Sequence, residues 1–127
     1  MKINDPRVVS EVEAVHARYN AALVANNVAT LNELFWQSPL TVRYGVGENL
    51  YGSDEIAAFR AARSPEGLAR RLSRTVITTY GEDFATASTL LHRDNAGARV
   101  GRQMQTWVRL PEGWRIVAAH VSMIDAV

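Results

Sequence analysis

Arg43 stands in the middle of residues 41–44, a segment whose other side chains favour a half-buried β-strand. Arginine is seldom fully buried, and a buried arginine is almost always paired. Arg43 has three possible kinds of partner: an acidic residue of the chain, a carboxylate of a ligand, or solvent at a strand edge. The acidic candidates are Glu48, Asp83 and Glu55. Because a guanidinium presents a planar fork that matches a carboxylate, Arg43 is the first candidate for an anion-binding residue.

Tyr19 is the second candidate, because it lies on the apolar stripe of a predicted helix together with Val8, Val12 and Val15. This position turns the ring toward the protein interior. A core tyrosine commonly gives its hydroxyl to a backbone carbonyl, which is the purely structural interpretation. In a pocket, an un-ionised phenol donates a hydrogen bond or a proton at neutral pH and is not a ready base.

Two glutamines, Gln103 and Gln105, alternate with other side chains in a predicted strand over residues 98–110. A hairpin that pairs Leu110 with Trp114 places the two glutamines on one face with Trp107, Val117, Ala119 and Val121, and places Met104, Thr106, Val108, Ile116, Ala118 and His120 on the other. The glutamines form either a polar pocket wall for a urea or carboxyl group or part of a hydrated outer face.

The histidines do not form a metal signature. His120 faces away from the glutamines in this register, which favours packing or an interface over general-base catalysis unless a bulge reverses the strand. His16 lies three residues before Tyr19, and His92 lies near a turn. Since the sequence contains neither cysteine nor a His-x-x-x-His pair, we expect no metal and no organic cofactor.

Other residues have less specific patterns. Trp36, Tyr51 and Trp107 are expected to form walls of the core and of the pocket, where we assign them to substrate binding. Arg70, Arg71 and Arg74 start a strand and are expected to be solvated, with the alternative that one of them faces inward as a second anion contact.

The elements that must position these residues form an α+β pattern. A helix begins at Pro6 with Asp5 as its N-cap, a second follows residues 26 and 27, and Ser53 is expected to cap a third, which has Arg60 and Arg63 near its end. Short strands over residues 41–44 and 50–51 precede the third helix, and long strands over 70–80, 84–93, 98–110 and 114–125 follow it. We predict a single domain over residues 1–127 in which the sheet curls around the first helix into a cone with one open mouth.

Composition excludes several classes of partner. The 127 residues are 47% hydrophobic and carry a net charge of only +1, which gives no field for nucleic acid or an anionic membrane. No apolar run is long enough to span a bilayer, and the N-terminus lacks the apolar core of a signal peptide. We therefore expect a cytoplasmic protein with no nucleic-acid or membrane partner.

Longer motifs resemble a known family. The order of elements and the closing segment 113–122, with the sequence GWRIVAAHVS, resemble the NTF2-like, SnoaL-like or cystatin-like cone, in which three N-terminal helices pack in a curved antiparallel β-sheet. Four segments resemble one family within this fold, the AtzH-like family (DUF3225), which includes proteins called HpxZ. These segments are residues 35–52, 59–63, 81–86 and 101–122.

The resemblance implies a function. AtzH-like proteins include members associated with oxalurate catabolism and a decarboxylating amidohydrolase that acts on 1,3-dicarboxyurea, and the family pattern implies catalytic roles for Tyr19 and Arg43. The expected activity is therefore decarboxylating C–N hydrolysis of a small anionic ureido-carboxylate. The alternatives are a non-enzymatic binding or accessory protein of an amidase pathway and a pure oligomerisation module.

The meander also has a second apolar face, with Val76, Thr78, Met104, Val108 and Ile116 as its candidate members. An exposed apolar face on a sheet is typical of an interface with another copy of the chain. We therefore expect a homodimer.

Overall fold

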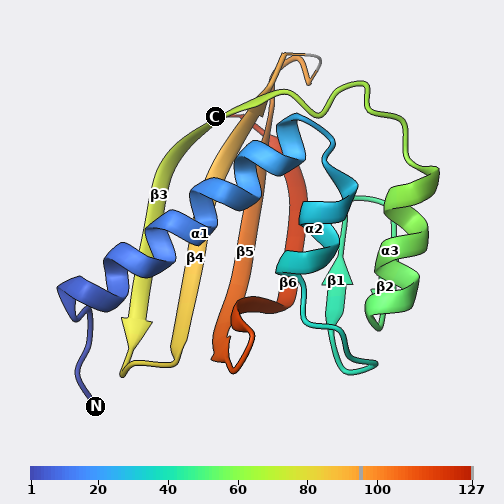
Figure 1. Ribbon diagram of the computed structural model, residues 1–127. Coiled ribbons are helices and arrows are strands. Elements are labelled where there is room, and N and C mark those ends of the chain that lie inside the picture. The colour runs from blue at the N-terminus through green and yellow to red at the C-terminus, as the bar shows by residue number, and fades with distance from the viewer. Residues whose placement is uncertain (95, 127) are drawn as a thin grey trace.

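The computed structural model describes residues 1–94 and 96–126 (Figure 1). Its helices are α1 (Pro6–Val24), α2 (Val28–Leu34) and α3 (Ser53–Ala62). Its strands are β1 (Val42–Tyr44), β2 (Asn49–Tyr51), β3 (Arg70–Tyr80), β4 (Phe84–Arg93), β5 (Arg99–Leu110) and β6 (Gly113–Asp125). The long strands begin and end within one residue of their predicted positions.

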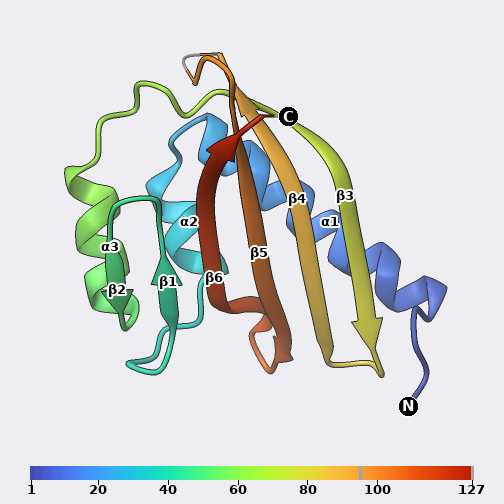
Figure 2. The ribbon, with the colours of Figure 1, turned by 180° about the vertical axis from the view of Figure 1, so that it is seen from behind.

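The strands form one curved sheet in the order β2-β1-β6-β5-β4-β3, and the predicted α+β class is confirmed (Figure 2). All neighbouring strands are antiparallel except β1 and β6, which are parallel. β1 and β6 are parallel because the chain leaves α2 at the end of the sheet where β6 begins. Both strands therefore run from the same end. There Phe35 bridges Ile116 in parallel, and the backbone amide of Trp36 donates to the carbonyl of Ile116.

Local sequence explains where the first two helices begin. The Asp5 carboxylate accepts a hydrogen bond from the Arg7 amide ahead of Pro6, and Asn27 caps α2 by accepting from the Thr30 amide. Both starts were predicted from the sequence.

The predicted cap of α3 is wrong by one residue. Gly52, at φ +87°, is the N-cap, and Ser53 is the first residue of the helix. The Ser53 hydroxyl instead accepts a hydrogen bond from the Ser38 amide at 3.0 Å. The loop after α2 therefore uses the side chain that was expected to cap α3.

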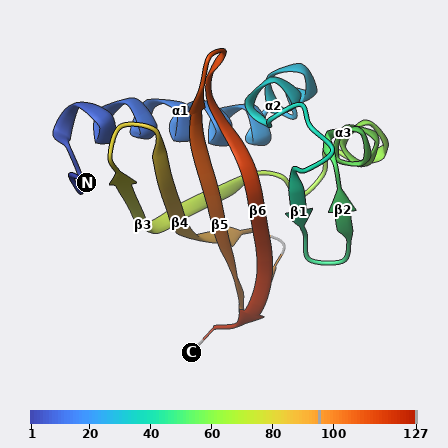
Figure 3. The ribbon, with the colours of Figure 1, turned by 90° about the horizontal axis from the view of Figure 1, so that it is seen from below.

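The helices cover one face of the sheet, and the opposite face carries none of the described helices (Figures 2 and 3). Apolar residues on the covered face form the core: from α1 Val8, Val12, Tyr19 and Leu23, from α2 Leu31 and Leu34, and from the sheet Ala85, Ala87, Trp107, Trp114 and Ile116. The covered face is therefore the inside of the cone, and side chains there meet α1 across the core.

A bulge corrects part of the predicted register. Met104 pairs with His120 and Gln105 with Ala119, as expected, but the register shifts between Thr106 and Trp107. One extra residue on β6 reverses the side-chain alternation beyond that point. Ile116, expected on the outer face, is therefore fully buried in the core, where no second copy can reach it.

Glu11 joins α1 to the closed end of the β5–β6 hairpin. Its Oε1 accepts hydrogen bonds from Nη1 of Arg109 at 2.5 Å and from Nε1 of Trp114 at 3.1 Å. These two donors, Arg109 first, lower the pKa of the Glu11 carboxyl below 4.5.

Glu11→Gln should lower the melting temperature by roughly 2–4 °C at pH 7, because a partly exposed charged pair contributes about 1 kcal/mol at most. A lowered folded-state pKa stabilises the protein above the unfolded-state pKa, and that stabilisation is lost as the pH falls through the folded-state value. The difference from wild type should therefore shrink from pH 5 toward pH 3. Thermal melts across this range check it, with the exposed Glu13→Gln as control. A difference that is constant with pH would contradict the assignment.

Candidate anion-binding site

Arg43 has an internal partner, and it is Glu48. Nη1 of Arg43 donates to Oε1 of Glu48 at 2.8 Å, and the two side chains are only 12% and 23% exposed. The second carboxylate oxygen accepts from the Gly47 amide at 3.2 Å. The Arg43 guanidinium also lies 5.5 Å from the centre of the Phe59 ring. Among the described residues, neither Asp83 nor Glu55 pairs with Arg43, so one carboxylate satisfies one edge of this cation.

The turn between β1 and β2 is built to let Glu48 reach Arg43. The Gly45 amide donates to the Glu48 carbonyl at 2.9 Å, which closes the hairpin. A Cβ atom on Gly45 would lie 1.7 Å from Oε1 of Glu48 and 3.0 Å from Nη1 of Arg43. The lack of a side chain at Gly45 is therefore what makes room for the ion pair.

Arg43 belongs to a group of arginines that we call the arginine cluster: Arg43, Arg60, Arg63, Arg70 and Arg93. They come from β1, from α3 and its C-cap, and from the adjacent ends of β3 and β4, where Arg70 and Arg93 are direct partners in the sheet. Over residues 1–94 and 96–126, the Arg43–Glu48 pair is the only ion pair in this cluster. Among the described residues, four of the five cations therefore have no acidic partner.

Two members of the cluster end on neutral amides. Nη1 of Arg60 donates to Oδ1 of Asn32 at 3.1 Å. Nε of Arg70 donates to Oδ1 of Asn20 at 2.9 Å, and its Nη1 donates to Oε1 of Gln103 at 2.8 Å. Amide oxygens orient these guanidiniums without neutralising them.

Burial and mutual repulsion act on the cluster together. Burial first, and then the nearby charges of Arg43 and Arg63, lower the pKa of Arg60 to about 10, against an opposing interaction with Tyr19. The pKa of Arg63 is lowered by burial first and by Arg43 second. Burial also lowers the pKa of Arg70, and here too the interaction with Tyr19 acts in the opposite direction. The charged forms are therefore destabilised in the absence of an anion.

Within residues 1–94 and 96–126, several buried donors of the cluster and of the inner face of β5 have no acceptor. These are Nε and Nη2 of Arg63, Nε of Arg93, and the Nε2 atoms of Gln103 and Gln105, whose side chains are 2% and 3% exposed. Nearly all buried donors in folded proteins are hydrogen-bonded, and leaving one unpaired is costly. Donors of this kind, gathered beside uncompensated cations, match the oxygen atoms of an anionic ligand.

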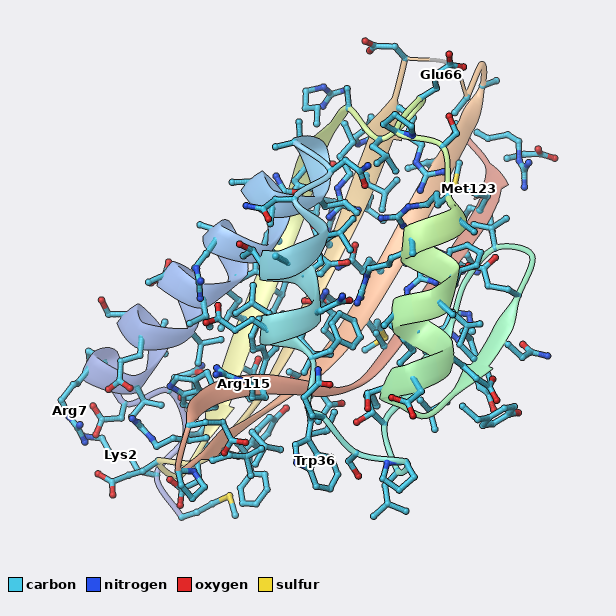
Figure 4. All side chains as sticks on the ribbon, turned by 45° about the vertical axis from the view of Figure 1, so that its right-hand side comes forward. Lys2, Arg7, Trp36, Glu66, Arg115 and Met123 are labelled. Carbon is cyan, nitrogen blue, oxygen red and sulfur yellow. The ribbon has the colours of Figure 1, made fainter. Side chains whose placement is uncertain are left out.

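A cavity of about 240 Å³ opens onto the cluster. Arg43, Glu48, Arg63 and Arg93 line it, together with residues of the loop that joins α3 to β3, among them Glu66. Figure 4 shows Glu66 at one end of the molecule and Trp36 near the opposite end. The cavity therefore lies at the end of the cone that this loop crosses.

The structure brings some of the predicted site residues together. Tyr19 is buried on α1 and interacts electrostatically with Arg60, Arg63 and Arg70, and Gln103 holds Arg70. Gln105 lies on the same inner face of β5, where its Oε1 accepts from Nε1 of Trp107 at 3.1 Å. Trp107 is fully buried, so it supports Gln105 from within the core.

Two predicted residues lie away from the cluster. Trp36 is at the other end of the molecule (Figure 4). Tyr51 is 54% exposed and pairs with Val42, the neighbour of Arg43, which places it on the outer face. Its hydroxyl is 3.0 Å from that of Tyr44, and this hydrogen bond raises the pKa of Tyr51.

The histidines lie in different surroundings. His120 is exposed on the outer face, with its ring centre 6.0 Å from that of Tyr44. His16 is buried, and desolvation first and the charge of Arg70 second lower its pKa, so His16 is neutral at pH 7. Neither histidine is placed as a general base toward the cavity.

Sequence reasoning did not identify Arg60, Arg63 and Arg93 as parts of the site. The first two were interpreted as cations at the end of a helix, but Arg60 follows the buried Ile56 by four residues and therefore shares its face. The spacing of Arg60 from Ile56 could therefore have identified Arg60 as an inward-facing residue. Of the three arginines at the start of β3, Arg70 is the one that faces inward, and Arg71 and Arg74 are exposed.

Within residues 1–94 and 96–126, no three acidic or histidine side chains gather in a group that could hold a metal ion. In the same part of the chain, no helix is long and apolar enough to cross a membrane.

Comparisons with known proteins agree with this architecture. The model of the family described as AtzH-like matches residues 1–127. A comparison with curated proteins gives no match.

Solved structures give close matches. A Pectobacterium atrosepticum protein of the DUF3225 family, described as of unknown function, is 58% identical over 97% of this chain and 95% of its own, with a TM-score of 0.94. A cystatin-like fold protein from Burkholderia xenovorans is 49% identical over 100% and 99% of the two chains, with a TM-score of 0.95. An NTF2-like protein with a cystatin-like fold from Novosphingobium aromaticivorans is 25% identical over 93% and 82%, with a TM-score of 0.71.

Arg63→Gln should raise the melting temperature of the ligand-free protein by about 2–4 °C, because it removes a partly buried cation with unpaired donors from the field of Arg43 and Arg93. Differential scanning calorimetry at pH 7 measures the change. Arg71→Gln, at an exposed position two residues after the loop, is the matched control and should leave the melting temperature unchanged. A fall of several degrees for Arg63→Gln would show that Arg63 stabilises the empty site.

Proposed function

Because this chain belongs to the AtzH-like family, we propose that it is an enzyme that breaks a C–N bond of a small ureido-carboxylate of the oxalurate or 1,3-dicarboxyurea type and that releases carbon dioxide from 1,3-dicarboxyurea, whose carboxylates are bonded to nitrogen. The observation that supports this proposal is the arginine cluster, in which, among the described residues, only Arg43 of the five arginines forms an ion pair. Such a site is complementary to a small anion, whose negative charge neutralises the guanidiniums. A neutral ligand would leave their charges uncompensated.

In this proposal Arg43 holds a ligand carboxylate. Only one edge of its guanidinium is occupied by Glu48, and both side chains line the cavity. The ligand carboxylate therefore shares Arg43 with Glu48 or replaces it. Gln103 and Gln105 offer their unpaired Nε2 donors to the urea carbonyl or a carboxylate oxygen.

Tyr19 is proposed to supply the proton. In the reaction the bond between the carbamate nitrogen and the carboxylate carbon breaks, the electron pair stays on nitrogen, and carbon dioxide leaves. The nitrogen takes a proton, which the Tyr19 hydroxyl donates and later recovers from water. This role is supported by the electrostatic interaction of the buried Tyr19 side chain with Arg60 and Arg70, two members of the arginine cluster.

We further propose that the protein is a homodimer that pairs through the outer face of the sheet. Met104 is 59% exposed there, with Val76 and Phe84 exposed on neighbouring strands. An apolar face of this kind is typical of an interface between copies. Met104→Glu should give a monomer in light scattering, whereas Leu40→Glu, at an exposed position elsewhere, should not. An unchanged dimer in Met104→Glu, or a monomeric wild type, would refute this interface.

The test of activity is release of carbon dioxide from 1,3-dicarboxyurea above the uncatalysed background. Arg43→Ala should lower kcat/KM by at least about 100-fold, because it removes a charged hydrogen-bond donor from the ligand. Tyr19→Phe should lower kcat by about 10²–10⁴ with little change in KM, which is the range for loss of a general acid.

Arg71→Gln is the control for both variants and should retain wild-type rates. Release that persists unchanged in Arg43→Ala would refute the proposal. If the protein binds ureido-carboxylates in calorimetry but turns none of them over, it is instead a binding or accessory protein that uses the same site.

A further inference from the structure

Arg63 and Arg93 line the same cavity as Arg43, yet neither has an acidic partner within residues 1–94 and 96–126. We infer that they form a second anion subsite, so that the ligand carries two carboxylates at the ends of a short chain. This inference rests on the proposed function, in which Arg43 binds the first carboxylate.

The donor geometry supports a subsite separate from Arg43. Among the residues that the structure describes, two buried nitrogens of Arg63, Nε and Nη2, have no acceptor, and neither does a third on Arg93, its Nε. Nε and an Nη atom are one pair of donors with which a guanidinium binds a carboxylate bidentately. Arg43 differs, because Glu48 already accepts from its Nη1. The unsatisfied donors of the cavity are therefore concentrated on Arg63 and Arg93.

The charge balance leads to the same conclusion. One ligand carboxylate on Arg43 would leave Arg63 and Arg93 as neighbouring, partly buried cations without an ion pair among the described residues, although Glu48 interacts favourably with Arg63 at longer range and Glu66 lines the same cavity. Removing charges from water is costly unless opposite charges and hydrogen bonds satisfy them. A second carboxylate provides both, and it does so for two guanidiniums at once.

A second subsite distinguishes between the two kinds of ligand in the proposed function. 1,3-Dicarboxyurea has a carboxylate on each nitrogen of a urea, five backbone atoms from end to end. Oxalurate has one carboxylate and ends in a neutral amide. Since the Arg63–Arg93 subsite is matched to a charge and not to an amide, the site favours the doubly charged ligand.

Two carboxylates also suit the reaction. The carboxylate that leaves as carbon dioxide loses its charge on the way to the transition state, so cations that grip it tightly would stabilise the ground state instead. A second carboxylate that does not react keeps its charge throughout the reaction. Arginines that bind this carboxylate therefore stabilise the ground state and the transition state equally. The subsite thereby positions the ligand without opposing the release of carbon dioxide.

The experiment uses two stable probes of the right length, glutarate and its monoamide glutaramate, which differ only in the second charge. Isothermal titration calorimetry at pH 7 should show that wild type binds glutarate at least about tenfold more tightly than glutaramate. In Arg63→Gln, in Arg93→Gln and in the double variant, this preference should fall to about twofold or less, while glutaramate affinity stays close to that of wild type. Arg43→Ala should weaken both probes.

Arg71→Gln is the matched control and should keep the wild-type preference. Equal binding of the two probes by wild type would overturn the second subsite and leave the one-carboxylate function standing. A preference that survives in the double variant would also overturn it. If neither probe binds wild type, and Arg43→Ala likewise fails to alter 1,3-dicarboxyurea turnover, the proposed function itself is refuted.

Discussion

In the part of the chain that the structure describes, five arginines gather inside the cone and only one of them forms an ion pair. Arg60 and Arg70 are held by Asn32, Asn20 and Gln103, which orient a guanidinium but leave its charge intact. Glu48 pairs with Arg43. Charged groups in a partly desolvated space repel one another more strongly than in water, so the cluster stores unfavourable electrostatic free energy that an anion releases. The rest of the molecule serves to hold these cations together.

Two parts of the fold counter that repulsion. One is the apolar core between α1 and the sheet, in which Trp107 and Ile116 are fully buried beside Phe35. The other is the network that fixes the end of the hairpin to α1 through Glu11. Burial of large apolar side chains contributes a few kcal/mol for each residue, which is enough to offset a strained site at one end. The core also contacts the arginine cluster directly, because the Arg60 guanidinium lies 4.2 Å from the centre of the Phe35 ring.

The bulge in β5 and β6 allows the inner face to change character along its length. On one side of it Gln103 and Gln105 face inward, toward the cluster, and on the other Trp107 and Ile116 fill the core. Gln105 lies between the two regions. Its Oε1 accepts a hydrogen bond from Trp107 in the core, and its Nε2 has no partner among the described residues. A strand without the shift would place Ile116 on the outer face.

The sequence by itself determined the elements and singled out Arg43 as the first candidate for an anion-binding residue. Asp5 with Pro6, Asn27 and the long β-forming runs are local signals, so the helix starts and strands could be predicted, and Arg43 was identifiable because a cation in an apolar strand requires a partner. What only the tertiary structure decided was which partner and which companions. Glu48, not Asp83 or Glu55, reaches Arg43 because Gly45 leaves room for it. Arg63 and Arg93 lie 30 residues apart in sequence and meet at one cavity only because the sheet brings the end of β4 beside the loop after α3. Side-chain direction along a helix or strand follows from sequence spacing, but contact between distant segments depends on curvature and register, which are properties of the whole sheet.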